Sequence, residues 1–514
     1  MAAPNQGGPA MCCHCMNRRE FLGVTTAMTL AAAAGASARA AAAWSEGYWD
    51  PAKPLYTQGR TLRVQPVLMY RVPVKREMTS YKSWGGVQSD EAAAEETGRI
   101  AGELNGLAAS SGFPMEVLPV IRVKTKEEAA AIDPKASDAT VVYPATGSGE
   151  TLNACIPDRG AVIFARHKSG PVYYWYEALS TKYLSSDKDA EKTEKRASVH
   201  DVVIDDLEEL RWRLRALYAV HNFLGCRIVA LGGPAGKYAG EAPQVARDKW
   251  GMDLVDYSYD DLSKRINALL ADPAAVALAE KWTDAFLALP GTVLETERPF
   301  VVNAFLLYGL FKDILAEHDA SVFTIKECMS TILPMSKTTA CLSLGLMNDE
   351  GLTAFCESDF VVVPAGVLLR YVSGRPVFMH NSTFPHDGVV TCAHCASPRR
   401  LDGDRYEPTR ILTHYESDFG AAPKVDMPVG QLVSFIDPEY ATGRWVGLKG
   451  EVVDNPFLEI CRSQQDVRVH GDWKRLLHEV RDSHWMMAYG DHLREVGYAA
   501  AKIGVTWDNL SEEA

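Results

Sequence analysis

Residues 207–237, LEELRWRLRALYAVHNFLGCRIVALGGPAGK, place a helix, a strand and a Gly-rich loop one after another. Apolar residues at helical spacing over 207–224 predict an amphipathic helix. The apolar run 227–231 predicts a short buried strand, and the loop 232–237 follows it. Helix and strand patterns alternating in this way indicate a parallel α/β sheet.

The loop Gly232-Gly233-Pro234-Ala235-Gly236-Lys237 has the glycine content of a phosphate-binding loop. It lacks the P-loop spacing, and Tyr238 stands where the hydroxyl residue after the lysine would be. We therefore expect a Gly-rich turn after a strand.

The same alternation extends toward the N-terminus. A helix is predicted over 89–109, and buried strands are predicted over 61–72, 115–121, 139–143 and 161–165, with Pro119 weakening the second of these. The polar stretch 185–198 is predicted to be a solvated connection, and helices are predicted over 260–270 and 273–288.

From residue 389 onward, Pro, Gly and short alternating runs predict antiparallel β structure, closed by helices over 473–480 and 490–503. The predicted fold class is therefore α/β. Two doubly wound parallel-sheet domains, at 45–200 and 201–380, are expected to precede a β-rich C-terminal domain at 381–514.

Bulk properties exclude several classes of partner. A chain of 514 residues is too long for one core, so more than one domain is expected. Its formal charge of -13 argues against nucleic acid and against an anionic membrane surface, because both are bound through Lys and Arg. No internal stretch is expected to be long and apolar enough to span a bilayer.

The N-terminus has the layout of an export signal. Paired Arg18-Arg19 precede an apolar, Ala-rich run at 23–34, and two A-x-A cleavage options follow. This order resembles a twin-arginine signal peptide at residues 1–40, which predicts a periplasmic or otherwise exported protein with no membrane partner once the signal is removed. A weak membrane anchor or an uncleaved tail is the alternative. Eight cysteines lie beyond this segment, and we predict few or no disulfides among them.

Residues 341–360, CLSLGLMNDEGLTAFCESDF, carry a Cys-Glu-x-Asp element at Cys356-Glu357-Ser358-Asp359. Downstream lie a histidine in Cys392-Ala393-His394-Cys395 and another in the run from Ser483-His484-Trp485 to Tyr489-Gly490-Asp491. From about residue 330 to the C-terminus, this order resembles the L-fucose/L-arabinose isomerase family. The resemblance implies a divalent-metal site with Glu357, His394 and His484 as ligands, and a homo-oligomer of three or six chains.

Family members place a second acid at the end of the strand over 376–380. Here the segment reads Phe378-Met379-His380-Asn381, so His380 or Asn381 takes the fourth metal position. Neither replaces a carboxylate. Asp387 or Asp359 could compensate, and Glu357 and Asp387 are the candidate catalytic acids.

The chemistry of aldose–ketose interconversion explains why such residues would be needed. A proton must move between neighbouring carbons through an enediol, with a carboxylate as base and a divalent ion stabilising the developing charge. Oxygen ligands combined with imidazole suit Mn²⁺. The predicted function is thus a metal-dependent, sugar isomerase-like protein acting on a small carbohydrate. A non-catalytic exported carbohydrate-binding protein, or a metal-dependent epimerase or lyase, is the alternative.

Other roles for the same residues stay open. Glu357 could cap the helix that follows it. His394 could belong to a structural zinc site or lie within a C-x-x-C redox pair. His484 could be a hydrogen-bonded interior histidine beside Trp485.

Overall fold

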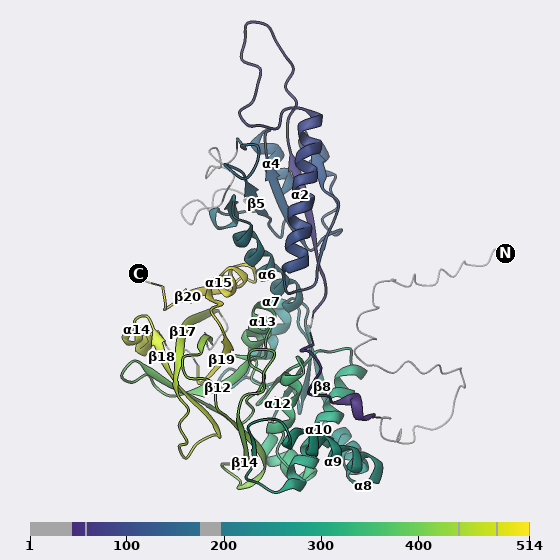
Figure 1. The fold of residues 1–514 in the computed structure, drawn as a ribbon, viewed down its shortest axis with the longest axis vertical. Helices are drawn as coiled ribbons and strands as arrows, with labels where there is room; N and C mark the ends of the chain where they lie inside the picture. Colours follow the sequence, from purple (N-terminus) through teal and green to yellow (C-terminus); the bar gives the residue numbers. More distant parts are fainter. Residues whose placement is uncertain are drawn as a thin grey trace, which may run out of the picture. The chain divides into compact units, whose positions relative to one another are not determined.

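The computed structural model describes residues 44–56, 59–174, 184, 197–439, 443–479 and 482–512. The predicted signal segment at 1–40 lies outside the described residues, as does most of the predicted connection at 185–198. The chain from Ala43 to Ala514 forms one compact unit (Figure 1). It is a mixed α/β structure with two parallel sheets and a C-terminal antiparallel β-barrel.

The first sheet is parallel throughout, in the order β2-β1-β4-β5-β6, with β3 also pairing with β1. Its strands are β1 (Leu62–Met69), β2 (Met115–Val117), β3 (Ile121–Val123), β4 (Ala139–Pro144), β5 (Val162–Ala165) and β6 (Val202–Ile204). The predicted strand over 115–121 is split in two around Pro119, whose nitrogen has no hydrogen to donate to a ladder.

Helices α2 (Asp90–Ser110), α3 (Lys126–Ala130), α4 (Gly149–Cys155) and α6 (Leu207–Phe223), with the short η1 (Glu46–Tyr48) and η2 (Val199–Asp201), complete this region. The side chain of Ser89 caps α2 by accepting from the Ala92 N–H. The predicted helices over 89–109 and 207–224 are confirmed to within a residue at each end.

The second sheet is also parallel, in the order β11-β10-β7-β8. Its strands are β7 (Arg227–Leu231), β8 (Asp253–Tyr257), β10 (Val322–Ile325) and β11 (Thr353–Phe355). The chain runs from β7 to β8 on one side and from β10 to β11 on the other. A topological switch point therefore lies between β7 and β10, and ligands of open α/β sheets bind at such points.

Helices α7 (Ala242–Trp250), α8 (Tyr259–Ala271), α9 (Pro273–Leu287), α10 (Arg298–Glu317), α11 (Leu333–Ser336), α12 (Cys341–Asp349) and α13 (Val363–Ser373), with the π-helical η3 (Cys328–Ile332), belong to this region. Asp272 separates α8 from α9 because its side chain caps α9, which begins at Pro273. This matches the predicted boundary between the helices at 260–270 and 273–288.

One helix corrects an expectation. Among the described residues, α10 is long and apolar enough to cross a membrane by length and composition, although no such stretch was expected. Of its most apolar window, 78% is buried inside the protein, and the helix packs against α9 and α12. Burial of this extent is what a helix that is apolar all round shows in the core of a large domain.

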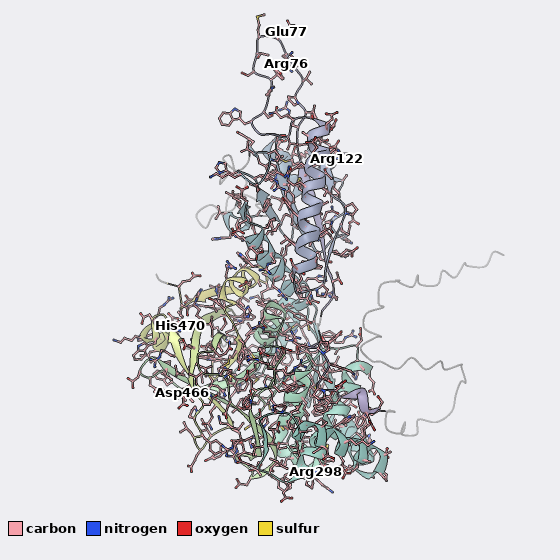
Figure 2. The ribbon with its side chains drawn as sticks, in the orientation of Figure 1. Arg76, Glu77, Arg122, Arg298, Asp466 and His470 are labelled. Atoms are coloured by element: carbon pink, nitrogen blue, oxygen red, sulfur yellow. The ribbon has the colours of Figure 1, made fainter. Side chains whose placement is uncertain are left out.

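The C-terminal strands form a closed ring. The order β16-β19-β12-β13-β18-β17 returns to β16, because β16 pairs with both β19 and β17. The strands are β12 (Phe378–Ser382), β13 (Val389–His394), β16 (Leu432–Pro438), β17 (Arg444–Asp454), β18 (Ser463–His470) and β19 (His484–Tyr489), all antiparallel to their ring neighbours. β20 (Thr506–Asn509) adds in parallel to β17, and Figure 2 labels Asp466 and His470 on β18.

A small sheet joins distant parts of the chain, since β9 (Thr292–Leu294) pairs with β14 (Thr409–His414), which pairs with β15 (Phe419–Val425). Helices α14 (Trp473–Glu479) and α15 (Leu493–Lys502) correspond to the predicted closing helices. One buried apolar cluster includes Leu104, Ile228 and Met486, so it reaches all three predicted domains. The domain boundaries at 200 and 380 stay a prediction.

Candidate metal centre

Glu357 lies just beyond β11, at the carboxyl end of the second sheet. Glu357 and Ser358 have φ angles of 64° and 48°, in the left-handed region that costs a non-glycine residue on the order of 1–3 kcal/mol. The loop after β7 holds this turn in place. The Ala235 N–H donates to the Ser358 carbonyl at 3.0 Å, and the Phe360 N–H donates to the Ala235 carbonyl at 2.8 Å.

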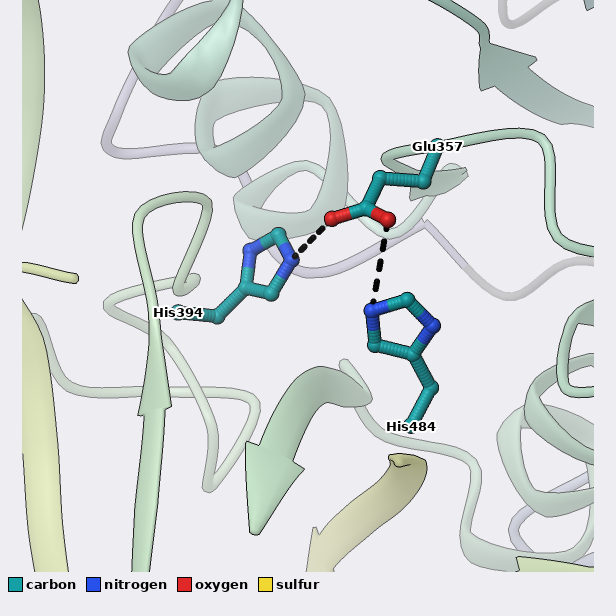
Figure 3. A group of neighbouring side chains, drawn as sticks. All are labelled: Glu357, His394 and His484. Atoms are coloured by element: carbon teal, nitrogen blue, oxygen red, sulfur yellow. Dashed lines mark ion pairs between the residues drawn. The ribbon is translucent and has the colours of Figure 1, made fainter. Parts of the chain in front are cut away.

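This placement decides between two readings of Glu357. Helix α13 begins at Val363 and has no side-chain cap, so Glu357 does not cap it. Its carboxylate instead faces two imidazole rings, one from the end of β13 and one from the start of β19 (Figure 3).

The three side chains converge on a small volume. His394 Nε2 is 3.6 Å from Glu357 Oε1, and His484 Nε2 is 3.4 Å from Glu357 Oε2, so each ring faces a different carboxylate oxygen (Figure 3). One ligand atom from each residue lies within 4.8 Å of the others. A carboxylate and two imidazoles at this spacing form a donor set suited to one divalent ion.

Buried ring nitrogens strengthen this interpretation. His484 Nδ1 donates to Asp359 Oδ2 at 2.8 Å, while its buried Nε2 has no hydrogen-bond partner among the described residues. Metal-binding histidines commonly give their second nitrogen to a carboxylate in this way, which orients the ring and leaves the other nitrogen for the ion. The donor set therefore fits a metal ion.

Asp359 is fixed by three contacts. Besides His484, it accepts from the backbone N–H of Lys237 at 2.9 Å and of Val361 at 3.2 Å. It belongs with Asp482 and His484 to a second, fully buried group of possible ligands. Asp359 thus orients His484 through its Nδ1, the ring nitrogen that does not face Glu357, and is not part of the group around Glu357.

The charges of the site are strongly coupled. Desolvation of the partly exposed Glu357 carboxyl opposes its ionisation, but the neighbouring imidazoles of His394 and His484 outweigh it and lower the pKa of this carboxyl well below the usual range. Burial favours the neutral ring of His484, but Asp359 and Glu357 outweigh it and raise the pKa of His484 to about 9. A bound cation would take the place of the His484 proton.

The structure separates the two candidates for the fourth position. Asn381 pairs across the sheet with His484 on one side and Ala393 on the other, so its side chain shares a face with His484. Its amide donates to the Ser483 carbonyl at 3.3 Å. An uncharged amide thus stands beside His484.

His380 pairs with Trp485 and points to the opposite face of β12, where its ring contacts Phe435 and Trp485 in the barrel core. Burial lowers the pKa of His380 to about 3. The structure does not bring this ring into the group around Glu357.

Asp387 is also apart from the group. It is exposed, with a φ of 49°, in the turn between β12 and β13. His394 stands at the other end of β13 (Val389–His394), a strand that at about 3.3 Å per residue is roughly 16 Å long.

Sequence reasoning missed Lys237. Its Nζ lies 3.8 Å from Glu357 Oε2, on the Gly-rich loop that was expected to be only a turn. Gly236 is needed there because a Cβ would lie 2.0 Å from the Ala239 carbonyl oxygen. The sequence signal that could have identified Lys237 is the position of its loop. The loop follows β7, and the carboxyl ends of β7 and β11 lie at the same edge of the parallel sheet.

The cysteines near His394 are arranged differently from a zinc site. All eight cysteines in the described part of the chain are free. Cys395 packs with Cys341 and Cys461, whereas Cys392 lies within the barrel core. Neither Cys392 nor Cys395 joins His394 in a group of possible ligands.

Comparison with family models finds no match for this chain. Comparison with curated proteins finds none either. The resemblance to the isomerase family stays a prediction that depends on the residues named above.

Proposed function

We propose that this protein is a metal-dependent, sugar isomerase-like enzyme that binds one divalent ion through Glu357, His394 and His484, with Mn²⁺ the expected metal. The observation that carries the proposal is the convergence of one carboxylate and two imidazoles from three separate elements. Asp359 supports it, because its bond to Nδ1 leaves His484 Nε2 directed at Glu357.

The reaction is an aldose–ketose interconversion. A bound divalent ion would supply Lewis-acid polarisation of neighbouring hydroxyl and carbonyl oxygens. The chain itself would supply the proton acceptor. Of the two acids expected for that role, Glu357 lies in the group and Asp387 lies at the far end of β13, so Glu357 is the better candidate.

A non-catalytic exported carbohydrate-binding protein is the second candidate. It is favoured by the presence of Asn381, not an acid, on the His484 face of β12. A metal-dependent epimerase or lyase would need the same ion and the same single carboxylate. Solvent-deuterium incorporation separates the binding protein from these enzymes, because only a protein that abstracts a proton from carbon exchanges it.

We also propose that the two parallel sheets are doubly wound, that the chain is exported through the twin-arginine pathway, and that it assembles into a homo-oligomer of three or six copies.

The test is elemental analysis of the purified protein, followed by proton NMR of aldoses incubated with it in deuterium oxide. Metal at about one equivalent per chain, with deuterium entering at the carbon next to the carbonyl, is expected. Glu357→Gln should abolish exchange and weaken metal retention, whereas Glu208→Gln on an exposed face of α6 should change neither. Wild-type protein without metal would overturn every enzymatic reading. Bound metal without deuterium exchange would favour the non-catalytic carbohydrate-binding protein.

A further inference from the structure

Lys237 is held in position beside the candidate metal centre. Its backbone N–H donates to Asp359 Oδ1 at 2.9 Å, and its loop is tied to the Glu357 turn through Ala235. The side chain is 30% exposed, and its Nζ lies 3.8 Å from Glu357 Oε2. In the described part of the chain the ammonium has this carboxylate as an ion-pair partner, and no hydrogen bond from Nζ is found.

Metal binding would change the surroundings of this ammonium. Glu357 presents one oxygen to each histidine, so an ion held by the three residues would draw on the same carboxylate that Lys237 faces. The single carboxylate of Glu357 would then face both a dication and the Lys237 ammonium. It neutralises only part of this positive charge, and the excess favours a further anion next to Lys237.

Two N–H groups of the loop backbone are already engaged. Those of Ala235 and Lys237 donate to Ser358 and Asp359. The loop also lacks the spacing of a P-loop, so a charged side chain is the stronger candidate for holding an anion here. The Lys237 side chain is a charged donor beside Glu357, at the carboxyl end of β7 next to the switch point with β10.

We infer that Lys237 is a specificity-determining residue that selects an anionic sugar, with its ammonium pairing with a carboxylate of the substrate while the ion holds the reacting oxygens. This inference rests on the proposed function. It narrows the substrate class from carbohydrates in general to sugar acids, with a sugar phosphate offering the same anionic chemistry.

Binding measurements test the inference without relying on turnover. Metal-loaded wild-type protein, Lys237→Gln and Lys237→Arg are titrated by calorimetry with D-glucuronate, D-glucose and D-glucose 6-phosphate, and the Mn²⁺ affinity is measured without sugar. Lys264→Gln is the matched control, because its side chain is 76% exposed on α8. Wild type should bind glucuronate about tenfold more tightly than glucose, as expected for one added ion pair at a partly buried site.

Lys237→Gln should remove that preference, leave glucose binding unchanged and tighten Mn²⁺ binding, since a positive charge next to the ion is lost. Lys237→Arg should retain much of the preference. A role for Lys237 in holding Glu357 would instead weaken Mn²⁺ binding in Lys237→Gln. That result, or equal wild-type affinities for all three sugars, would overturn the inference.

Three further outcomes are distinguishable. Tighter binding of glucose 6-phosphate than of glucuronate would assign the anion as a phosphate. Wild-type protein that binds no metal would overturn the proposed function and this inference with it, whereas metal binding without any preference for anionic sugars would overturn the inference alone.

Discussion

Asp359 and His484 form a buried pair in which Nδ1 donates to Oδ2 at 2.8 Å. Because this bond occupies Nδ1, Nε2 of the same ring is left facing Glu357. A loop of the second sheet thereby sets the orientation of a histidine that belongs to the barrel.

Replacing Asp359 should weaken metal binding without removing a ligand. Asp359→Asn keeps an oxygen for the Lys237 and Val361 N–H groups but loses the charge that orients His484. Loss of such a supporting carboxylate typically costs 10–100-fold in metal affinity. Titration with Mn²⁺ checks this, with Asp260→Asn in the first turn of α8 as control. An unchanged affinity would show that Asp359 only stabilises the loop.

Asn381 is the position at which one substitution should strengthen the centre. Its side chain shares a face with His484, so Asn381→Asp would add a carboxylate beside the ion. We expect Mn²⁺ to bind about tenfold more tightly, because hard cations prefer charged oxygen ligands. His380→Phe is the control, since this ring points into the barrel core and its loss should leave metal affinity unchanged. The prediction fails if His380→Phe, and not Asn381→Asp, alters metal binding.

Asp349 should make stability depend on pH. It is fully buried and accepts from the Arg399 and Arg400 N–H groups at 2.6 and 2.8 Å, yet burial raises the pKa of its carboxyl to about 6. A raised acid pKa means that the stabilising contribution is complete below the unfolded value near 3.8 and is lost as pH rises through about 6.

Asp349→Asn keeps an acceptor for both N–H groups and removes the buried charge. Its melting temperature should equal that of wild type at pH 4. At pH 7–8 it should melt at a higher temperature, with a free energy of unfolding larger by about 1–3 kcal/mol. Thermal unfolding across this pH range is the measurement. A variant that is less stable than wild type at pH 8 would mean that the two arginines need the charge.

Gly236 should be intolerant of any side chain. An added Cβ would meet the Ala239 carbonyl, a backbone atom, at 2.0 Å. Gly236→Ala should therefore lower stability by about 1–3 kcal/mol and displace Lys237. Gly98→Ala is the matched control, because its Cβ would meet nothing within 4 Å in helix α2 and alanine is favoured in a helix interior. Equal melting temperatures for the two variants would contradict the prediction.

Much of the fold follows from local pattern. The strand Arg227–Leu231 was predicted at its observed bounds, and Ser89 and Asp272 mark helix boundaries through caps whose chemistry is readable in sequence. The closed ring of strands was not predicted, because the pairing of β16 with β17 and β19 depends on contacts far apart in the chain. Alternation identifies a strand but does not name its neighbours.

The three candidate metal ligands could be predicted from the sequence, whereas the residues around them could not. Glu357, His394 and His484 were named from their order and neighbours, and the structure brings them together. The choice between His380 and Asn381 required register, because a shift of one residue reverses the face of a strand. Lys237 was missed because its significance depends on spatial proximity to Glu357 across the sheet edge.

The closed ring has one more consequence. His394 and His484 come from strands of a ring without a free edge, whereas Glu357 stands on a turn of a different sheet. An ion bound by all three residues would link the barrel to the turn after β11. Metal binding would therefore restrict the motion of this turn relative to the barrel. Amide hydrogens of the turn after β11 would then exchange with solvent more slowly in the loaded protein than in the empty one.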